Sequence, residues 1–154
     1  MIVVADTSPL NYLILIDHIE LLPRLYQSVV IPQGVIDELN HILTSEKVKL
    51  WVNALPSWVI VRSVVPIPIE GKLGVGEREA IALAQLLDAD TILLDDKYAR
   101  NVAEARGLIV TGTLGVLVLA AQLEEIDLTT ALVMLQSTSF HMTAELMQSI
   151  LQFE

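Results

Sequence analysis

The chain has 154 residues, 53% of them hydrophobic, and a formal net charge of −10 at pH 7. The length suits one domain with a buried core, and the charge excludes a broad basic surface that would hold nucleic acid through its phosphates. Because there are no cysteines, disulfides, thiolate metal sites and a cysteine nucleophile are excluded.

The first half of the chain alternates short apolar runs with stretches of helical period. We expect strands at 2–6, 28–32 and 58–64, and helices at 8–16, 18–26, 33–43 and 46–55. Ser8 is the expected N-cap of the first helix, with Pro9 at its first helical position. Prolines and glycines predict a loop over 66–76.

The second half continues the same alternation. We expect strands at 91–95 and 108–112, and helices at 77–88, 96–107, 113–125, 129–136 and 143–152. Strands that alternate with helices imply right-handed crossovers and a mostly parallel sheet covered on both faces. The predicted fold is therefore α/β, a three-layer α/β/α sandwich.

Carboxylates follow two of the predicted strands. Asp6 ends the first apolar run, and Asp95 and Asp96 end "TILLDD". Open α/β sheets bind ligands at the carboxyl edge of their strands, so these acids meet in one crevice if the two strands are neighbours. Each aspartate is equally open to a simpler interpretation, the N-cap of the helix that follows it.

Three glutamates extend the acidic set from helices. In "VIDELNHIL", Glu38 lies at the edge of the apolar stripe and is able to face inward, whereas Asp37 lies on the solvated side. Glu77 and Glu79 begin the helix that leads into the fourth strand, where acids also favour the helix dipole. Being two residues apart, they do not point the same way, and the pattern leaves open which one joins the cluster.

Acidic side chains that converge in this way favour a hard divalent cation. Oxygen ligands suit Mg²⁺ and Mn²⁺, which activate water and stabilise the oxygens in phosphodiester cleavage. The candidate metal ligands are Asp6, Glu38, Glu77, Glu79, Asp95 and Asp96.

Five segments carry a family resemblance in order and spacing. "VVADTSPLNYL", "IPQGVIDEL", "GVGEREAIALA", "LLDDKYAR" and "VTGTLGVL" resemble the PIN domain, in particular its compact prokaryotic branch related to VapC-type toxin ribonucleases. The resemblance covers residues 1–124 as a PIN-like domain and 125–154 as a C-terminal helical extension of the same domain. It implies an α/β/α fold, Mg²⁺ or Mn²⁺ as cofactor, cleavage of single-stranded RNA, and an antitoxin protein as partner.

The resemblance also assigns roles to residues. The acids that match the catalytic quartet are Asp6, Glu38, Glu77 and Asp96, with Glu79 as the rival third acid and Asp95 beside the fourth. The third position is often Asp in the family and is Glu here. Substrate contacts are expected, weakly, from Ser8, Arg78, Lys97 and Arg100. An ion pair of Arg100 with Asp96, one turn back on the helix, is an equally simple role for that arginine.

Two functions remain open from the sequence. One is a metal-dependent endoribonuclease that acts as the toxin of a toxin–antitoxin pair, and the other is a PIN-like binding module with weak or no nuclease activity. The acids favour the first, and the negative charge with few basic residues favours the second. "GVGERE" lacks the third glycine of a dinucleotide loop, "EGKLG" lacks the pattern of a phosphate loop, and the histidines have no metal-ligand spacing.

The composition also carries expectations about location and assembly. The longest apolar stretch, "LGVLVLAAQL", is too short to span a membrane, and "MIVVAD" has no basic region of the kind that begins a signal peptide. We therefore expect a cytoplasmic protein. Because the hydrophobic fraction is high, we also expect a homo-oligomer formed through apolar helical faces.

Overall fold

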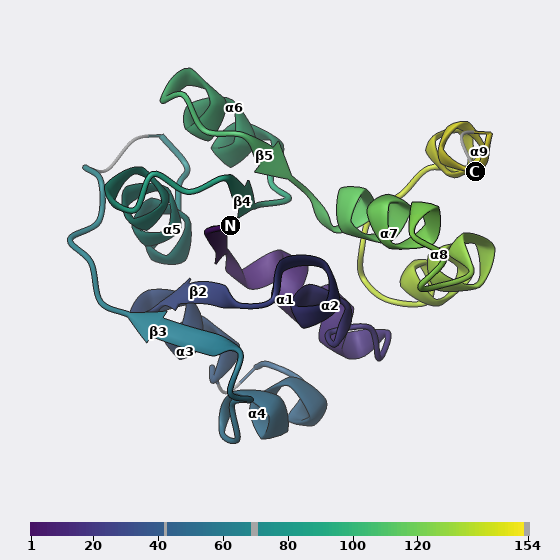
Figure 1. Ribbon diagram of the computed structural model, residues 1–154, viewed down its shortest axis with the longest axis horizontal. Helices are drawn as coiled ribbons and strands as arrows, with labels where there is room; N and C mark the ends of the chain where they lie inside the picture. Colours follow the sequence, from purple (N-terminus) through teal and green to yellow (C-terminus); the bar gives the residue numbers. More distant parts are fainter. Residues whose placement is uncertain (42, 69–70, 153–154) are drawn as a thin grey trace.

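The computed structural model describes residues 1–41, 43–68 and 71–152 of the chain (Figure 1). The strands are β1 (Val3–Ala5), β2 (Val29–Pro32), β3 (Val59–Arg62), β4 (Thr91–Leu93) and β5 (Val110–Thr111). The helices are α1 (Thr7–Leu15), α2 (Leu21–Tyr26), α3 (Gln33–Leu39), α4 (Glu46–Val52), α5 (Val75–Leu86), α6 (Lys97–Ala105), α7 (Thr113–Gln122), α8 (Leu128–Gln136) and α9 (Ala144–Leu151).

The strands form one parallel sheet in the order β3-β2-β1-β4-β5. This confirms the predicted α/β/α architecture. The structure also makes β1 and β4 neighbours, the condition on which the acids would share one crevice, and they pair from Val3 with Thr91 to Ala5 with Leu93. The chain leaves β1 toward β2 on one side, and β4 lies on the other. The carboxyl ends of β1 and β4 therefore flank the point where the strand order reverses, which is where sheets of this kind bind ligands.

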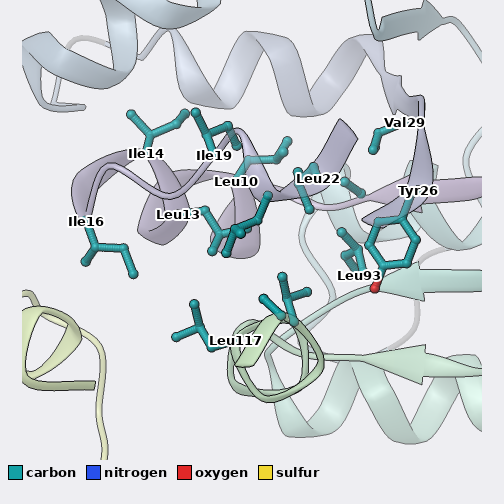
Figure 2. Close-up of a cluster of buried hydrophobic side chains, with 14 of the residues drawn as sticks. Leu10, Leu13, Ile14, Ile16, Ile19, Leu22, Tyr26, Val29, Leu93 and Leu117 are labelled. Carbon is teal, nitrogen blue, oxygen red and sulfur yellow. The ribbon is translucent and has the colours of Figure 1, made fainter. Parts of the chain in front are cut away.

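Alternate strand residues point to two separate cores. Val3, Ala5, Ile31 and Leu93 belong to one hydrophobic cluster. Figure 2 shows how this cluster draws together side chains of α1, α2, β4 and α7. Val4, Val30, Ile92 and Leu94 point the other way, into a second cluster closed by α5 and α6. This period of two follows from the pleat of a strand, and it gives the sheet a helical layer on each face (Figure 1).

The last two helices pack outside α7. Leu128, Leu132 and Leu135 of α8 are fully buried or nearly so and belong to the first cluster. The ring of Phe140, between α8 and α9, meets Tyr12 of α1 edge-on, with centroids 5.0 Å apart. In Figure 1 these helices form the end of the molecule at which the chain terminates.

Several predicted boundaries are wrong by up to a turn. The first helix begins at Thr7 with Asp6 as its N-cap, not at Pro9 with Ser8 as the cap, so Pro9 occupies the third helical position. The third helix ends at Leu39 rather than 43, and position 42 of that expected helix lies outside the described residues. The helix expected from 77 begins at Val75. The loop expected over 66–76 includes 69 and 70, which also lie outside the described residues.

The apolar stretches of the sequence are too short to predict a membrane-spanning helix. Among the described residues, no helix is both long enough and apolar enough to cross a bilayer.

Candidate metal centre at the carboxyl edge of the sheet

Asp6 lies at the centre of the candidate site. It follows β1 directly, and its backbone N–H donates to the carbonyl of Leu93 in β4 over 2.9 Å, which fixes it between the two strands. The residue is only 4% exposed. Its Oδ1 atom is buried and has no hydrogen-bond partner among the described residues. A buried carboxylate oxygen without a partner is costly and uncommon in a folded protein.

The surroundings of Asp6 disfavour its charged form. Burial raises the pKa of the Asp6 carboxyl well above its usual range, and the opposing effect of a hydrogen bond from the Thr7 backbone is smaller. The negative charges of Glu77, Glu38 and Asp95 raise this pKa further. Acids from three other segments are therefore near enough to act on Asp6 electrostatically.

Glu38 reaches this edge from α3. Its Oε2 accepts a hydrogen bond from the Thr7 hydroxyl over 2.5 Å, and its Oε1 accepts one from the Gly76 N–H over 2.9 Å. Glu38 and its neighbour Asp37 are both exposed, and Asp37 accepts from Gln33 on its own helix. Glu38 is therefore an exposed residue at the boundary of the apolar stripe whose carboxylate bonds to residues of α1 and α5.

Glu77 enters the site from the first turn of α5. Its Oε1 accepts from the Gly74 N–H over 3.0 Å. Burial raises the pKa of Glu77 more than that hydrogen bond lowers it, and the charges of Asp96 and Glu38 raise it as well. Glu77 is therefore close to acids from both β4–α6 and α3.

Glu79 points elsewhere, toward the start of α3. Its Oε1 accepts from the Gly34 N–H over 3.0 Å. A Cβ on Gly34 would lie 2.7 Å from Cδ of Glu79, so only glycine leaves room for this contact. Glu79 on Gly34 and Glu38 on Gly76 form a reciprocal pair, which we call the α3–α5 clasp. In it each helix presents a carboxylate to the positive N-terminal end of the other.

The adjacent acids Asp95 and Asp96 diverge and serve different helices. Asp96 is the N-cap of α6, and its Oδ2 accepts from the Ala99 N–H over 2.9 Å. Asp95 accepts from both the N–H and the hydroxyl of Thr113, each over 2.7 Å, and so holds the start of α7. Burial raises the pKa of Asp95 in spite of these bonds, while the charge of Arg100 lowers it. The N-cap interpretation therefore explains the position of Asp96, and the contacts of Asp95 with Thr113 explain that of Asp95.

The candidate substrate residues are dispersed. Arg78 donates from Nε to the carbonyl of Ile67 over 2.9 Å, so it holds the preceding loop rather than facing the acids. Lys97 is exposed at the start of α6. Arg100 acts electrostatically on Asp95, and no ion pair with Asp96 is found among the described residues.

Two threonines carry contacts that the sequence analysis missed. Thr7, rather than Ser8, provides the hydroxyl that meets Glu38, and Thr113 binds Asp95. Ser8 itself is half-buried in the first turn of α1. Both threonines start a helix directly after a strand, at the edge where the acids lie, and this position was the signal that could have identified them.

The donor set fits a hard divalent cation. The acidic side chains gathered here offer carboxylate oxygens, the ligands that such ions prefer, and Asp6 Oδ1 has no hydrogen-bond partner among the described residues. In their present positions, no three acidic or histidine side chains of the described residues are close enough to hold one ion together. Asp6, Glu38, Glu77 and Asp96 are the residues that would hold it, and their side chains would have to move closer together to do so.

Comparisons with known proteins give the chain a family. A family model described as PIN domain matches residues 2–153. The fold is similar to that of a PilT N-terminus domain protein from the hyperthermophilic archaeon Sulfolobus solfataricus, with a TM-score of 0.53 and 20% sequence identity over 93% of this chain and 100% of that chain. No curated protein sequence matches. Since the family model spans nearly the whole sequence, the chain belongs to the PIN domain family.

Proposed function

We propose that the chain is a metal-dependent endoribonuclease that hydrolyses phosphodiester bonds of single-stranded RNA. The observation that carries the proposal is the buried, unpartnered oxygen of Asp6 at the point where the strand order reverses, with acids from α3, α5 and the β4–α6 junction acting on it. Membership of the PIN domain family supports it, because PIN domains are generally metal-dependent nucleases.

In this proposal the four acids have distinct structural supports. Asp6 is held by β1 and β4, Glu38 by Thr7 and Gly76, Glu77 by Gly74, and Asp96 by its own helix α6. Mg²⁺ or Mn²⁺ bound by them would supply Lewis-acid activation of water and of the phosphodiester. The acids orient the reacting groups, and their separate supports keep four like charges at one edge.

RNA is the proposed substrate in spite of the overall negative charge. Lys97 and Arg100 lie on α6, just after Asp95 and Asp96 in the sequence. Together with a bound divalent ion they offset the negative charges of the four acids, which lessens the local repulsion of a phosphate in a chain of net charge −10. Binding of this kind weakens steeply as salt concentration rises.

The alternative is a binding module that keeps the PIN fold with weak or no nuclease activity. The observation in its favour is that each of Glu38, Glu77 and Asp96 already accepts a hydrogen bond from a backbone N–H. In this alternative the acids serve as helix caps, the protein binds neither metal nor RNA at this edge, and adding either one leaves its stability unchanged.

A pair of variants on one helix tests the proposal. Single-stranded RNA is incubated with the purified protein in Mn²⁺ or Mg²⁺, with a chelator as the blank, and cleavage is followed on a gel. We expect cleavage by the wild type to require metal and to fall by about 10²-fold or more in Glu77→Gln. Glu79→Gln is the matched control, because glutamine still accepts from the Gly34 N–H, and it should retain activity. Metal-dependent cleavage that survives in Glu77→Gln would remove Glu77 from the site.

We further propose that the nuclease is the toxin of a toxin–antitoxin pair, as in the related branch of the family. Induced expression should arrest growth of the host, and the Asp6→Asn variant should not. Co-expression of a small protein encoded next to this gene should restore growth by binding the toxin. Growth unaffected by the wild-type chain would contradict a toxin role while leaving the nuclease assay intact.

A further inference from the structure

A cavity of about 580 Å³ lies next to the acidic edge, between α7 and the C-terminal segment. One wall is formed by β5 and α7, and the opposite wall by Phe140, His141 and Leu146, which come from the loop before α9 and from α9 itself. Its volume is within the range of roughly 300–1,000 Å³ that is typical of small-molecule sites.

The cavity shares a wall with the candidate metal centre. Asp95 and Arg100 line it, and Asp95 directly precedes Asp96. A Cβ on Gly112 would lie 2.9 Å from Nη1 of Arg100 and 3.0 Å from Oδ1 of Asp95, so both groups lie over this glycine. A guanidinium carries five N–H donors, which leaves donors of Arg100 available beyond its interaction with Asp95.

A second glycine leaves the cavity open at α7. Gly115 lines it at an exposed position inside the helix, where glycine weakens a helix relative to alanine. Any larger residue there would place its side chain at the cavity wall. Glycine at position 115 therefore lowers the stability of α7 but keeps the cavity wide at this point.

The remaining walls are apolar or aromatic. Phe140 is half-buried and fixed edge-on against Tyr12, and Leu146 is 41% exposed on α9. Fixed aromatic and aliphatic walls suit a flat base, which stacks on such surfaces with little regard to its sequence identity. Arg100 and His141 lie at the same cavity, and a guanidinium is a preferred partner of phosphate.

We propose that this cavity binds one nucleotide of single-stranded RNA, next to the bond that is cut. The base lies against Phe140 and Leu146, and its phosphate faces Arg100, which leads the strand toward the acids. The placement of this nucleotide beside the bond that is cut rests on the proposed nuclease function. An anionic ligand with a flat ring fits the combination of the Arg100 guanidinium and the apolar walls better than an apolar peptide side chain, which offers no acceptor to the guanidinium donors that Asp95 leaves available.

The test of binding needs neither metal nor cleavage. Each of the four nucleoside 5′-monophosphates is titrated into the uniformly ¹⁵N-labelled protein in a chelator, and amide signals are followed by NMR. We expect at least one nucleotide to saturate and to shift Gly112 and Gly115. Leu146→Trp fills the cavity and should weaken this binding about tenfold or more, and Leu146→Glu should weaken it by replacing the apolar surface on which the base lies with a carboxylate.

A matched control uses a similar exposed position on another helix. Val133 is 54% exposed on α8 and does not line the cavity, so Val133→Trp should bind nucleotide as the wild type does. Spectra of the free proteins establish that all three variants are folded. The proposal would be overturned if the wild type did not bind any nucleotide, or if both Leu146 variants bound nucleotide as tightly as the wild type does. A neutral phenylalanine amide that saturates the same signals when no nucleotide does would assign the cavity to a peptide instead.

Cleavage then separates this inference from the proposed function. The wild type should favour one nucleotide beside the cut, and Leu146→Trp should lose that preference and raise KM while retaining metal-dependent cleavage. Cleavage with an unchanged preference and KM in Leu146→Trp would overturn the nucleotide site but not the nuclease. Nucleotide binding without any cleavage by the wild type would overturn the nuclease but not the binding site.

Discussion

Asp6 and Asp127 occupy the same formal position in two very different surroundings. Each is the N-cap of a helix, α1 for Asp6 and α8 for Asp127. Asp127 accepts hydrogen bonds from the N–H and the hydroxyl of Thr130, and these bonds lower the pKa of its exposed carboxyl. Asp6 is buried with one oxygen unpartnered, and burial raises its pKa.

The difference shows that capping explains one aspartate and not the other. A cap needs only a short polar side chain at the helix start, and solvent at Asp127 stabilises the charge. Asp6 makes no side-chain hydrogen bond to the first turn of its helix beyond Thr7, yet it brings a carboxylate into the core. Unfavourable groups of this kind are concentrated at functional sites, and a counter-ion would relieve this one.

The largest expected effect comes from removing the charge of Asp6. Millimolar Mg²⁺ or Mn²⁺ should raise the melting temperature of the wild type on the order of 5–10 °C if the ion is at about 100 times its Kd. Asp6→Asn should abolish that shift, and Asp127→Asn should keep it. Thermal melts with and without each ion measure both. An equal metal shift in Asp6→Asn and the wild type would show that Asp6 is not a ligand.

Asp96→Asn should have the next largest effect, because it separates the capping role from the metal role within one residue. Asparagine caps a helix about as well as aspartate, so the stability of the metal-free protein should stay within about 0.5 kcal/mol or rise slightly. Metal stabilisation and RNA cleavage should both disappear. A variant that loses stability without metal, yet still responds to metal, would leave Asp96 as a cap alone.

The pH dependence of the metal-free protein gives a smaller effect. The pKa of Asp6 is higher in the folded than in the unfolded chain, where it is about 3.9. The folded state therefore binds its proton more tightly, and the stability from that proton is lost as pH rises from the unfolded toward the folded pKa. Urea melts at a series of pH values from about pH 4 upward should show this loss, and Asp6→Asn should reduce it. Equal slopes in the two proteins would contradict the raised pKa.

The smallest effect is expected at Asp127. Asp127→Ala should lower the melting temperature slightly, since it removes an exposed cap, and Asp127→Asn should be close to the wild type. Its lowered pKa means that the contribution of the charged form is present above the unfolded pKa and is lost as pH falls through the folded one. A large loss of cleavage in Asp127→Asn would show that the comparison of the two caps is misleading.

The fold could be predicted from the sequence because buried parallel strands leave short apolar runs between helical stretches. The pairing of β1 with β4 did not follow from these patterns, because apolar runs give no strand order, and the helical period of α3 placed Glu38 only at the edge of the apolar stripe. The start of α1 was not predicted, because Thr7, Ser8 and Pro9 offer competing helix-start signals, and Ser8 was the expected N-cap while Asp6 was open to either a site role or a capping role.

The site was less predictable where the decision depends on contacts distant in sequence. Glu77 and Glu79 share a helical turn and point in different directions. Which of the two faces the other acids depends on distant contacts, such as that of Glu79 with the Gly34 N–H, 45 positions earlier in the chain. The cavity beside Arg100 depends on how α9 packs against α7, which the apolar period of either helix alone does not specify.

The α3–α5 clasp has a consequence for how the chain matures during synthesis. Its two hydrogen bonds join residues 38 positions apart for Glu38 with Gly76 and 45 apart for Glu79 with Gly34. Contacts of such separation form late, after local helices and after the chain between them has been made. Until α5 leaves the ribosome, Glu38 lacks its Gly76 partner and Glu77 has not joined Asp6. A nascent chain would therefore hold an incomplete acidic site, and the domain would complete the site only once its second half had docked.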